Sequence, residues 1–221
     1  MPQTSTGSSA ETRQTIRSRM RSQRRALSPH AQDQAARELD KLLGRQPLFQ
    51  RSRHIAFYRA ADGEIDPHRL LQSALHRKKR CYLPALHPSQ SGKLKFIQFN
   101  GLTPLESNRY GIAEPPMGSG RCMPANQLDL VLLPLVAFDF QGARLGMGAG
   151  FYDRTFAFKA GQGRQSPILV GLAHGCQGVP SLPVEPWDVP LTAIATESGL
   201  IVCDGRAHGR DFLRRDLLRH D

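Results

Sequence analysis

Apolar positions in the first quarter of the chain recur every three or four residues, which is typical of helices. Residues 13–27 have a thin apolar stripe and predict one helix. A second helix is expected to begin at Ser28-Pro29, because serine caps helices and proline fits the first turn. Gly44 is a natural end for it. Its apolar positions are Ala31, Ala35, Leu39 and Leu42.

The next part of the chain alternates short apolar runs with one amphipathic segment. The runs at 54–60 (HIAFYRA) and 80–86 (RCYLPAL) predict strands. Between them, Asp66-Pro67 is expected to start a helix, so the order is strand, helix, strand. A connection of this length indicates a parallel pair of strands. Residues 93–100 (KLKFIQFN) predict a further strand.

Residues 128–138 (LDLVLLPLVAF) are nearly all apolar and predict one strand buried on both faces. Further strands are expected at 167–174 and 191–196, and a short helix near the carboxyl end. This alternation predicts the α/β class, as a single three-layer α/β/α domain with a mostly parallel central sheet. The expected organisation is a disordered leader at 1–12, the domain at 13–203 and a basic carboxyl-terminal tail at 204–221.

Length and composition narrow the classes of protein. The 221 residues, 39% of them hydrophobic, suffice for one large α/β domain with its own core. No apolar run approaches the ~18 residues that span a bilayer, and the polar amino terminus lacks the apolar stretch of a secretory signal. The four cysteines form no C-x-x-C pair, so free thiols in the cytoplasm are expected.

The charge balance is strongly basic, with 30 lysines and arginines against 19 acidic residues and a formal net charge of +11. Residues 1–25 hold six arginines and one glutamate, a local charge of +5. An arginine-rich end suits a nucleic-acid-binding protein, or it only keeps the chain soluble. No known nucleic-acid-binding motif accompanies it, so a basic nucleic-acid-binding protein stays the alternative function.

The most informative segment is FDFQGARLGMGAGFYDR at 138–154, where a buried strand leads to glycines at every second position. Backbone N–H groups at Gly146, Gly148 and Gly150 could turn toward one anion at the start of the next helix. Arg144 suits a phosphate, and Asp153 suits a divalent cation beside that phosphate. The alternative is a tight turn without a ligand, because the segment is neither a Walker loop nor a Rossmann fingerprint.

This segment, extended to PLVAFDFQGARLGMGAGFYDR, closely resembles the signature of the 5-formyltetrahydrofolate cyclo-ligase family. The family's other motifs follow in the family's order, so the resemblance covers most of the chain. They are an R-x-x-x-R pair at Arg13 and Arg17, DGEID at 62–66, YLP at 82–84, IAEP at 112–115, AHGCQ at 173–177 and LPVEPWD at 182–188.

The resemblance implies ATP-dependent cyclisation of 5-formyltetrahydrofolate to 5,10-methenyltetrahydrofolate, with release of ADP and phosphate. Phosphorylation of the formyl oxygen makes it a leaving group, and the substrate's own N10 then closes the ring. Such chemistry needs alignment, charge neutralisation and exclusion of water rather than a protein nucleophile. A sugar-phosphate or CoA enzyme that shares the fold is a further alternative, because fold alone does not determine function.

The same resemblance assigns roles to individual residues. The expected catalytic residues are Arg144 and Tyr152, and the expected Mg²⁺ ligands are Asp153 and Asp188. The residues expected to bind the folate are Arg59, Glu64 and Phe151. The residues expected to bind ATP are Arg13, Arg17, Arg144, Leu145, Gly146, Met147, Gly148, Ala149, Gly150, Phe151 and Tyr152. The implied partners are 5-formyltetrahydrofolate and Mg-ATP, with no nucleic acid and no membrane, and the chain is expected to be a monomer.

Several of these residues also have plainer interpretations. Arg13 and Arg17 share one helix face, which phosphate binding requires, but a solvated basic helix shows the same spacing. A carboxylate at Glu64 suits the N–H donors of a pterin, yet an exposed turn acid is the alternative. Asp188 could instead cap a turn. His174 and Cys176, two apart in a predicted strand, would point the same way and form either a nucleophilic pair or strand packing.

The chain departs from the family pattern at three positions. The family usually has lysine where this chain has Arg13, and some relatives have basic residues where it has Met147 and Ala149. Phosphate binding is therefore expected to depend more on the loop backbone and on Arg144.

Overall fold

The computed structural model describes residues 11–159 and 167–203. Its helices are α1 (Arg13–Arg25), α2 (Pro29–Gly44), α3 (Pro47–Arg51), α4 (His68–His76) and α5 (Phe151–Phe156). The strands of the main sheet are β1 (His54–Ala56), β2 (Arg80–Leu86), β3 (Leu94–Phe99), β6 (Cys122–Met123), β7 (Leu130–Pro134), β10 (Ile168–Leu172), β11 (Ala193–Thr196) and β12 (Gly199–Val202). Two small ribbons pair β4 (Glu106–Ser107) with β5 (Ala113–Glu114), and β8 (Ala137–Phe138) with β9 (Arg144–Leu145).

The main sheet has the strand order β12-β11-β10-β7-β1-β2-β3-β6. Its five central strands, from β11 to β2, run parallel, and β3, β6 and β12 are antiparallel to their neighbours. Ile55 of β1 lies opposite Cys81 on one side and Leu130 on the other. The chain adds β2 on one side of β1 and the later parallel strands on the other. This change of direction between β1 and β7 marks the place where such sheets bind ligands.

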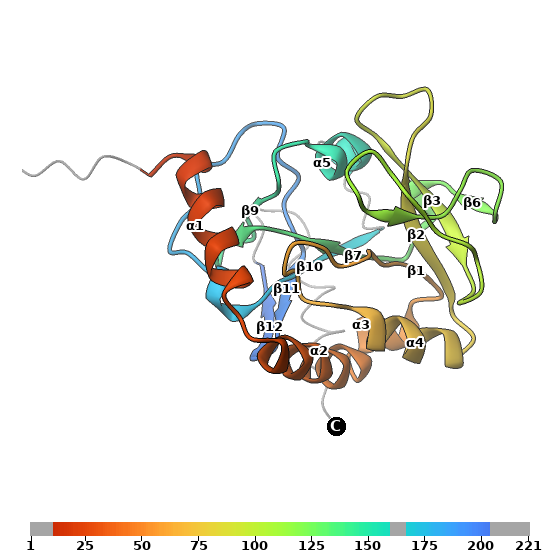
Figure 1. Ribbon diagram of the computed structural model, residues 1–221, viewed down its shortest axis with the longest axis horizontal. Helices are drawn as coiled ribbons and strands as arrows, with labels where there is room; N and C mark the ends of the chain where they lie inside the picture. Colours follow the sequence, from red (N-terminus) through yellow and green to blue (C-terminus); the bar gives the residue numbers. More distant parts are fainter. Residues whose placement is uncertain (1–10, 160–166, 204–221) are drawn as a thin grey trace, which may run out of the picture.

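Alternate residues of the central strands build two hydrophobic faces. Ile55 and Leu132 face one cluster, to which α2, α3 and α4 contribute leucines and Phe49. Val131 and Leu133 face the other cluster, to which α5 contributes Phe156. The three helices lie along one side of the sheet and α5 on the other, while α1 stands at one end (Figure 1). The α/β class with a mostly parallel sheet is confirmed, although within residues 11–159 and 167–203 the second helical layer consists of the six-residue α5, short 3₁₀ turns and loops.

The expected long strand at 128–138 is wrong, because the chain leaves the sheet after Pro134. The Leu135 carbonyl would bond a neighbouring strand if the sheet continued. It instead accepts hydrogen bonds from the side chains of Arg24 and Gln177. The Val136 amide then donates a 2.7 Å hydrogen bond to the Leu145 carbonyl, which starts the separate ribbon of β8 and β9. The pattern of apolar residues along the chain does not show that side chains from other segments will bond the backbone here.

The first strand is also shorter than expected, since β1 ends at Ala56 rather than at residue 60. The short helix α3 and the antiparallel strand β12 were not expected from the pattern. The start of α2 is confirmed, with Ser28 Oγ accepting from the Ala31 amide at 3.2 Å and Gly44 as the last helical residue.

The two ends of the chain fall largely outside the described residues. Of the expected leader, residues 11 and 12 are described, and Thr12 caps α1 through a 3.2 Å hydrogen bond to the Thr15 amide. The rest of the leader, the 204–221 tail and its expected short helix lie outside the described ranges. Among residues 11–159 and 167–203, every helix is too short or too polar to cross a bilayer.

Candidate active site

The predicted site residues gather at the carboxyl ends of the central parallel strands. The loop after β1 carries Glu64, the chain after β7 carries the glycine segment, and α1 packs over both. Ile16 and Met20 on the inner face of α1 contact the β8–β9 ribbon through a small apolar cluster that includes Leu145. The helix is therefore held where its arginines face these loops.

The glycine loop from Gly146 to Gly150 is exposed between β9 and α5. Gly148 and Gly150 have φ values of +105° and +63°, which non-glycine residues rarely adopt. Gly146 lies outside that range, with open space where a Cβ would stand. Leu145, expected to bind ATP, is buried with its side chain in the α1 cluster, so only its backbone borders the loop.

Arg17 connects α1 to this loop. Its Nε donates to the Gly146 carbonyl at 2.9 Å, and its guanidinium lies beside Gly148, less than 4 Å from where a Cβ of that residue would stand. Burial and the charge of Arg13 lower the pKa of Arg17. A second positive charge this close favours an anion between the two side chains.

Arg13 forms a two-pronged ion pair with Asp188. Its two terminal nitrogens lie 2.7 and 3.2 Å from the carboxylate oxygens. The hydrogen bond to Asp188 raises the pKa of Arg13. Burial opposes the charge on Asp188, but the bonds from Arg13 and the Glu185 amide prevail and lower the pKa of that carboxyl group. Asp188 also fills the turn-capping role expected as its alternative.

Arg144 lies at the base of the site with its side chain only 5% exposed. It donates to the Val189 carbonyl and to Asp153 Oδ1. Burial lowers its pKa, against the attraction of the two aspartates. Asp153 Oδ1 also accepts from the Val189 amide at 3.2 Å. The structure thus places Asp153 next to Asp188, although 35 residues separate them in the sequence.

These two carboxylates form a small donor set. No group of three or more His, Cys, Asp or Glu side chains suited to a metal ion occurs in the part of the chain that the structure describes. Both aspartates are paired with arginines, so a cation here would share them. Two carboxylates suit a Mg²⁺ ion that obtains its other ligands from phosphate and water.

Glu64, the carboxylate expected to bind folate, lies in a turn after β1, and its side chain is 12% exposed. It accepts from the Ala61 amide at 3.1 Å, and one oxygen lies 3.7 Å from Arg24. Burial raises its pKa to about 7, although Arg24 and the amide act in the other direction. The neighbouring Asp62 is also partly buried, but hydrogen bonds from Arg21, Arg24 and Arg25 outweigh burial and lower its pKa to about 2.

Two other side chains of this loop face elsewhere. Arg59, expected to bind folate, has its Nη1 within 3.3 Å of His68 Nδ1. Tyr58 is buried and donates from its hydroxyl to the Ile65 carbonyl at 2.5 Å. Neither contact directs a polar group toward Glu64.

Aromatic rings link the two parts of the site. Phe151 meets Tyr110 edge to face at 5.7 Å, and Arg154 lies over the Phe151 ring at 5.9 Å. Tyr152 stacks on Phe156 at 6.4 Å. Burial raises the pKa of Tyr152, and the negative charge of Glu64 adds to this effect. Tyr152 follows Phe151 in the first turn of α5, directly after the glycine loop.

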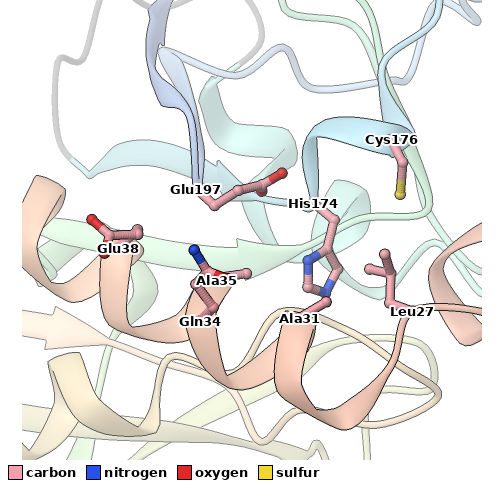
Figure 2. A pocket seen from close by; sticks show the side chains of 8 residues that line it. All are labelled: Leu27, Ala31, Gln34, Ala35, Glu38, His174, Cys176 and Glu197. Carbon is pink, nitrogen blue, oxygen red and sulfur yellow. The ribbon is translucent and has the colours of Figure 1, made fainter.

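A separate hollow of about 310 Å³ lies between the first turns of α2 and the chain that follows β10 (Figure 2). His174 and Cys176 line it, but β10 ends at Leu172, and a short 3₁₀ turn (Gly175–Gln177) follows His174. The expectation that both project from one strand is therefore wrong. The His174 ring is buried and directed at Ala31, whereas Cys176 is exposed (Figure 2). Although the residue is exposed, partial burial of its sulfur and the negative charge of Glu197 raise the pKa of the Cys176 thiol, which disfavours a nucleophilic thiolate.

Sequence reasoning missed Arg24, whose side chain has no exposed surface and contacts the Asp62 and Glu64 turn. A signal was present, because Arg24 is eleven positions after Arg13 and eleven residues make just over three helical turns, which returns Arg24 to nearly the same face. It also missed Tyr110 and Arg154, which contact Phe151 from a loop and from α5. Arg154 ends the 138–154 segment but was given no role there, and Tyr110 lies outside the quoted motifs.

Comparison with known proteins identifies the family of the chain. The 5-formyltetrahydrofolate cyclo-ligase of Haemophilus influenzae is 42% identical over 179 residues, which cover 81% of this chain and 94% of the relative. The enzyme of the same description from Escherichia coli K12 is 40% identical, covering 81% of this chain and 97% of the relative. A solved structure of the Aquifex aeolicus 5,10-methenyltetrahydrofolate synthetase matches with a TM-score of 0.74 at 27% identity, covering 90% of this chain and 97% of that one. The profile of the 5-formyltetrahydrofolate cyclo-ligase family matches residues 9–197, and the chain belongs to that family.

Proposed function

We propose that the chain catalyses ATP-dependent cyclisation of 5-formyltetrahydrofolate to 5,10-methenyltetrahydrofolate at the carboxyl edge of its parallel strands. One observation carries this proposal: groups that suit Mg-ATP and groups that suit a pterin meet there. The glycine loop, Arg17 and the paired aspartates form the first set. Glu64, Tyr152 and Phe151 form the second. Membership of the cyclo-ligase family supplies the reaction.

The triphosphate is expected to lie along the exposed loop from Gly146 to Gly150. Arg17 uses Nε to hold the Gly146 carbonyl, so its terminal nitrogens are placed to contact a phosphate above Gly148. Arg13 would share its guanidinium between Asp188 and a phosphate oxygen. Arg144 is buried beneath Asp153, so its contribution is to hold that carboxylate and add positive charge.

Magnesium fits the two aspartates as a companion of ATP. The hydrogen bonds to Asp153 described above go to Oδ1, which leaves Oδ2 for a cation. Asp188 is the second carboxylate, held by Arg13. Bound there, Mg²⁺ would neutralise charge on the transferring phosphate. Because each aspartate is already paired with an arginine, the protein holds both carboxylates in place before the ion arrives.

The pterin is expected to lie against Phe151 and Tyr110 with its N–H edge at Glu64. A carboxylate accepts two parallel hydrogen bonds from neighbouring N–H donors, as the aminopyrimidinone edge presents them. Tyr152 lies in the first turn of α5, directly after the glycine loop, so its hydroxyl is expected to lie near the junction of the two substrates. Arg59 faces His68, so its part in folate binding would require a different rotamer.

The chemistry then needs little from the protein beyond placement. The formyl oxygen attacks the γ-phosphorus, and the bond to the ADP oxygen breaks. N10 attacks the resulting iminium carbon, and the C–O bond breaks, so that phosphate leaves with the former formyl oxygen and N10 loses its proton. Positive charge from Arg17 and Arg144 stabilises the phosphoryl group in transfer, and the aromatic rings exclude water.

One assay tests the proposal. Purified protein is mixed with 5-formyltetrahydrofolate and Mg-ATP, and the methenyl product is followed by its absorbance. Product that requires ATP supports the proposal, and its absence overturns it. Asp153→Asn is expected to reduce Mg²⁺-dependent turnover at least tenfold while the protein stays folded. Asp33→Asn is the matched control, since Asp33 also pairs with arginines but lies on α2, away from the site.

Other features of the proposal rest on the sequence. We expect the enzyme to act in the cytoplasm as a monomer, with Mg-ATP and the folate as its partners. Size-exclusion chromatography with light scattering checks the oligomeric state.

Nucleic acid remains the competing partner for the basic helix, but Arg13, Arg21 and Arg24 of α1 are paired with acidic side chains of the same chain. This pairing favours the small-anion interpretation.

A further inference from the structure

Arg24 is a fully buried cation near the folate side of the site. Its side chain has no exposed surface, and it lies on the last turn of α1. Burying a guanidinium is costly unless its donors are bonded and its charge is paired. The contacts that meet this requirement lead directly to the turn that carries Glu64.

The guanidinium joins the ends of two strands. Nε donates to the Asp62 carbonyl at 2.8 Å, and Nη2 to Asp62 Oδ2 at 2.8 Å. Nη1 donates to the Leu135 carbonyl at 3.1 Å, where the chain has just left β7. Nη2 also lies 3.7 Å from a carboxylate oxygen of Glu64. One side chain therefore touches the loop after β1, the end of β7 and the folate-side carboxylate.

The turn itself needs such support, because its backbone is unusual. Asp62 has a φ of +54° and Gly63 a φ of +75°, so two successive residues are left-handed. A non-glycine residue in this region costs roughly 1 kcal/mol or more, which the surroundings must offset. A Cβ at Gly63 would lie 3.2 Å from the carbonyl oxygen of Arg24, so the turn packs directly on the end of α1.

We propose that Arg24 is a positioning residue for folate binding: it fixes the 61–64 turn against the end of β7, and its guanidinium, 3.7 Å from the Glu64 carboxylate, favours the ionised form of that group. This inference rests on the proposed function for the role of Glu64. Arg24 has no exposed surface in the described structure, so it acts through Glu64 rather than on the substrate.

Among the described residues, the charged and titratable groups that act on Glu64 or on its turn come from several elements. Arg24 approaches from α1 and Asp62 lies in the same turn, while the Tyr58 hydroxyl is bonded to the Ile65 carbonyl and Tyr152 lies on α5. His174, from the chain after β10, contacts the backbone of Gly63. Arg24 is the cation among them, and Asp62 and burial both favour the protonated form of Glu64. Removing the charge of Arg24 therefore moves the pKa of Glu64 upward from about 7.

Folate affinity should follow this ionisation, because a protonated carboxyl group cannot accept both pterin N–H bonds. With a pKa near 7, about half of the Glu64 side chains are ionised at pH 7. An increase of about one pKa unit lowers that fraction to roughly one tenth, so the KM for folate at pH 7 rises about fivefold. Raising the pH restores affinity, which a purely structural defect would not do.

The experiment compares three variants with the wild type after ATP-dependent product formation by the wild type has been established. Arg24→Met removes the charge and keeps an unbranched apolar chain. Arg24→Lys keeps the positive charge but replaces the planar guanidinium, with its several N–H donors, by a single ammonium group. Arg21→Met is the matched control, because Arg21 also bonds Asp62 Oδ2 at 2.8 Å but is half-buried and makes no close pair with Glu64. KM for folate and KM for ATP are measured from pH 6 to 9, and ¹³C-labelled glutamate NMR, assigned with Glu64→Gln, follows Glu64 directly.

Arg24→Met is expected to move the pH profile of folate KM and the NMR titration upward by about one unit or more, with ATP KM changed less than threefold. Arg24→Lys should shift both in the same direction by less, because one ammonium cannot serve Asp62 and Glu64 together. Arg21→Met should keep the wild-type profile. Wild-type titration of Glu64 in Arg24→Met, or in Arg24→Lys if the first variant does not fold, overturns the inference. An equal upward shift of the folate KM profile and of the Glu64 titration in Arg21→Met also overturns the inference. An inactive wild type would refute the proposed function instead, while the NMR titration would still test Arg24.

Discussion

Replacing Gly148 by alanine tests whether the glycine loop needs its backbone conformation. Gly148 has a φ of +105°, beyond the left-handed region near +57° that other residues occasionally adopt. Space is not the obstacle, since the nearest atoms to an added Cβ belong to the Arg17 guanidinium at 3.8 Å or more. The cost is therefore backbone strain, and it falls where the loop meets Arg17.

The size of the effect follows from these facts. Strain at such a φ costs about 1–3 kcal/mol, and alanine regains about 0.4–1 kcal/mol by restricting the unfolded chain. A net loss of about 1–2 kcal/mol corresponds to a fall in Tm of roughly 2–8 °C for a chain of this size. If the loop moves instead to relieve the strain, the phosphate-binding amides move with it. The KM for ATP is then expected to rise tenfold or more, because misplacement by about 1 Å has effects of that order.

Gly146→Ala is the matched control for this prediction. Gly146 lies two positions earlier in the same loop, outside the positive φ range, and no atom lies within 4 Å of its added Cβ. Its Tm is expected to stay unchanged or to rise slightly. Differential scanning calorimetry and ATP titration of the cyclisation rate give both readouts. Equal Tm and equal ATP KM in Gly148→Ala and wild type would refute the reasoning, as would a larger loss of stability in Gly146→Ala.

Three further predictions concern the charged groups. Asp62, with a pKa of about 2 in the fold, adds stability at neutral pH that is progressively lost as the pH falls from about 4 toward 2. Urea unfolding should therefore show that Asp62→Asn narrows the stability difference between pH 7 and pH 3 by about 1 kcal/mol, and an unchanged difference would contradict this assignment. Asp188→Asn removes the two-pronged partner of Arg13 and should raise ATP KM at least tenfold, with folate KM kept within threefold; a selective effect on folate would show that the pockets are reversed. Trp187, the single tryptophan, is 67% exposed beside Asp188, so its fluorescence should change on addition of Mg-ATP, and Asp188→Asn should need at least tenfold more Mg-ATP for the same change.

The fold could be predicted from the sequence wherever one apolar pattern was supported by local backbone signals. The start of α2 has a capping serine and an N1 proline, and β2 has turns on both sides, so their ends were placed correctly. The run at 128–138 failed because its end is decided by distant side chains. Arg24 and Gln177, from elsewhere in the chain, bond the Leu135 carbonyl and turn the backbone out of the sheet. Periodicity contains no information about such partners.

In the candidate site, too, the features with a local sequence signal could be predicted and those decided by the fold could not. Helical spacing alone predicts that Arg13 and Arg17 share a face, and the structure agrees, since both approach the carboxyl edge of the sheet. The proximity of Asp153 and Asp188 could come only from the family resemblance, because the fold brings them together through Val189. Arg24 was missed for another reason: in an arginine-rich helix, composition does not distinguish the buried arginine from its exposed neighbours.

The position of α1 explains why so much of the site depends on one helix outside the layers of the sheet (Figure 1). Its apolar anchors, Ile16 and Met20, contribute about 1.5–3 kcal/mol each by burial, which is little for a 13-residue helix. Polar contacts of Arg13, Arg17 and Arg24 with the domain must supply much of the remaining attachment. The same three side chains contact Asp188, the glycine loop and the turn that carries Glu64. Under the proposed function, docking of α1 therefore completes both substrate pockets, and a ligand that engages Arg13 and Arg17 should also stabilise the docked helix.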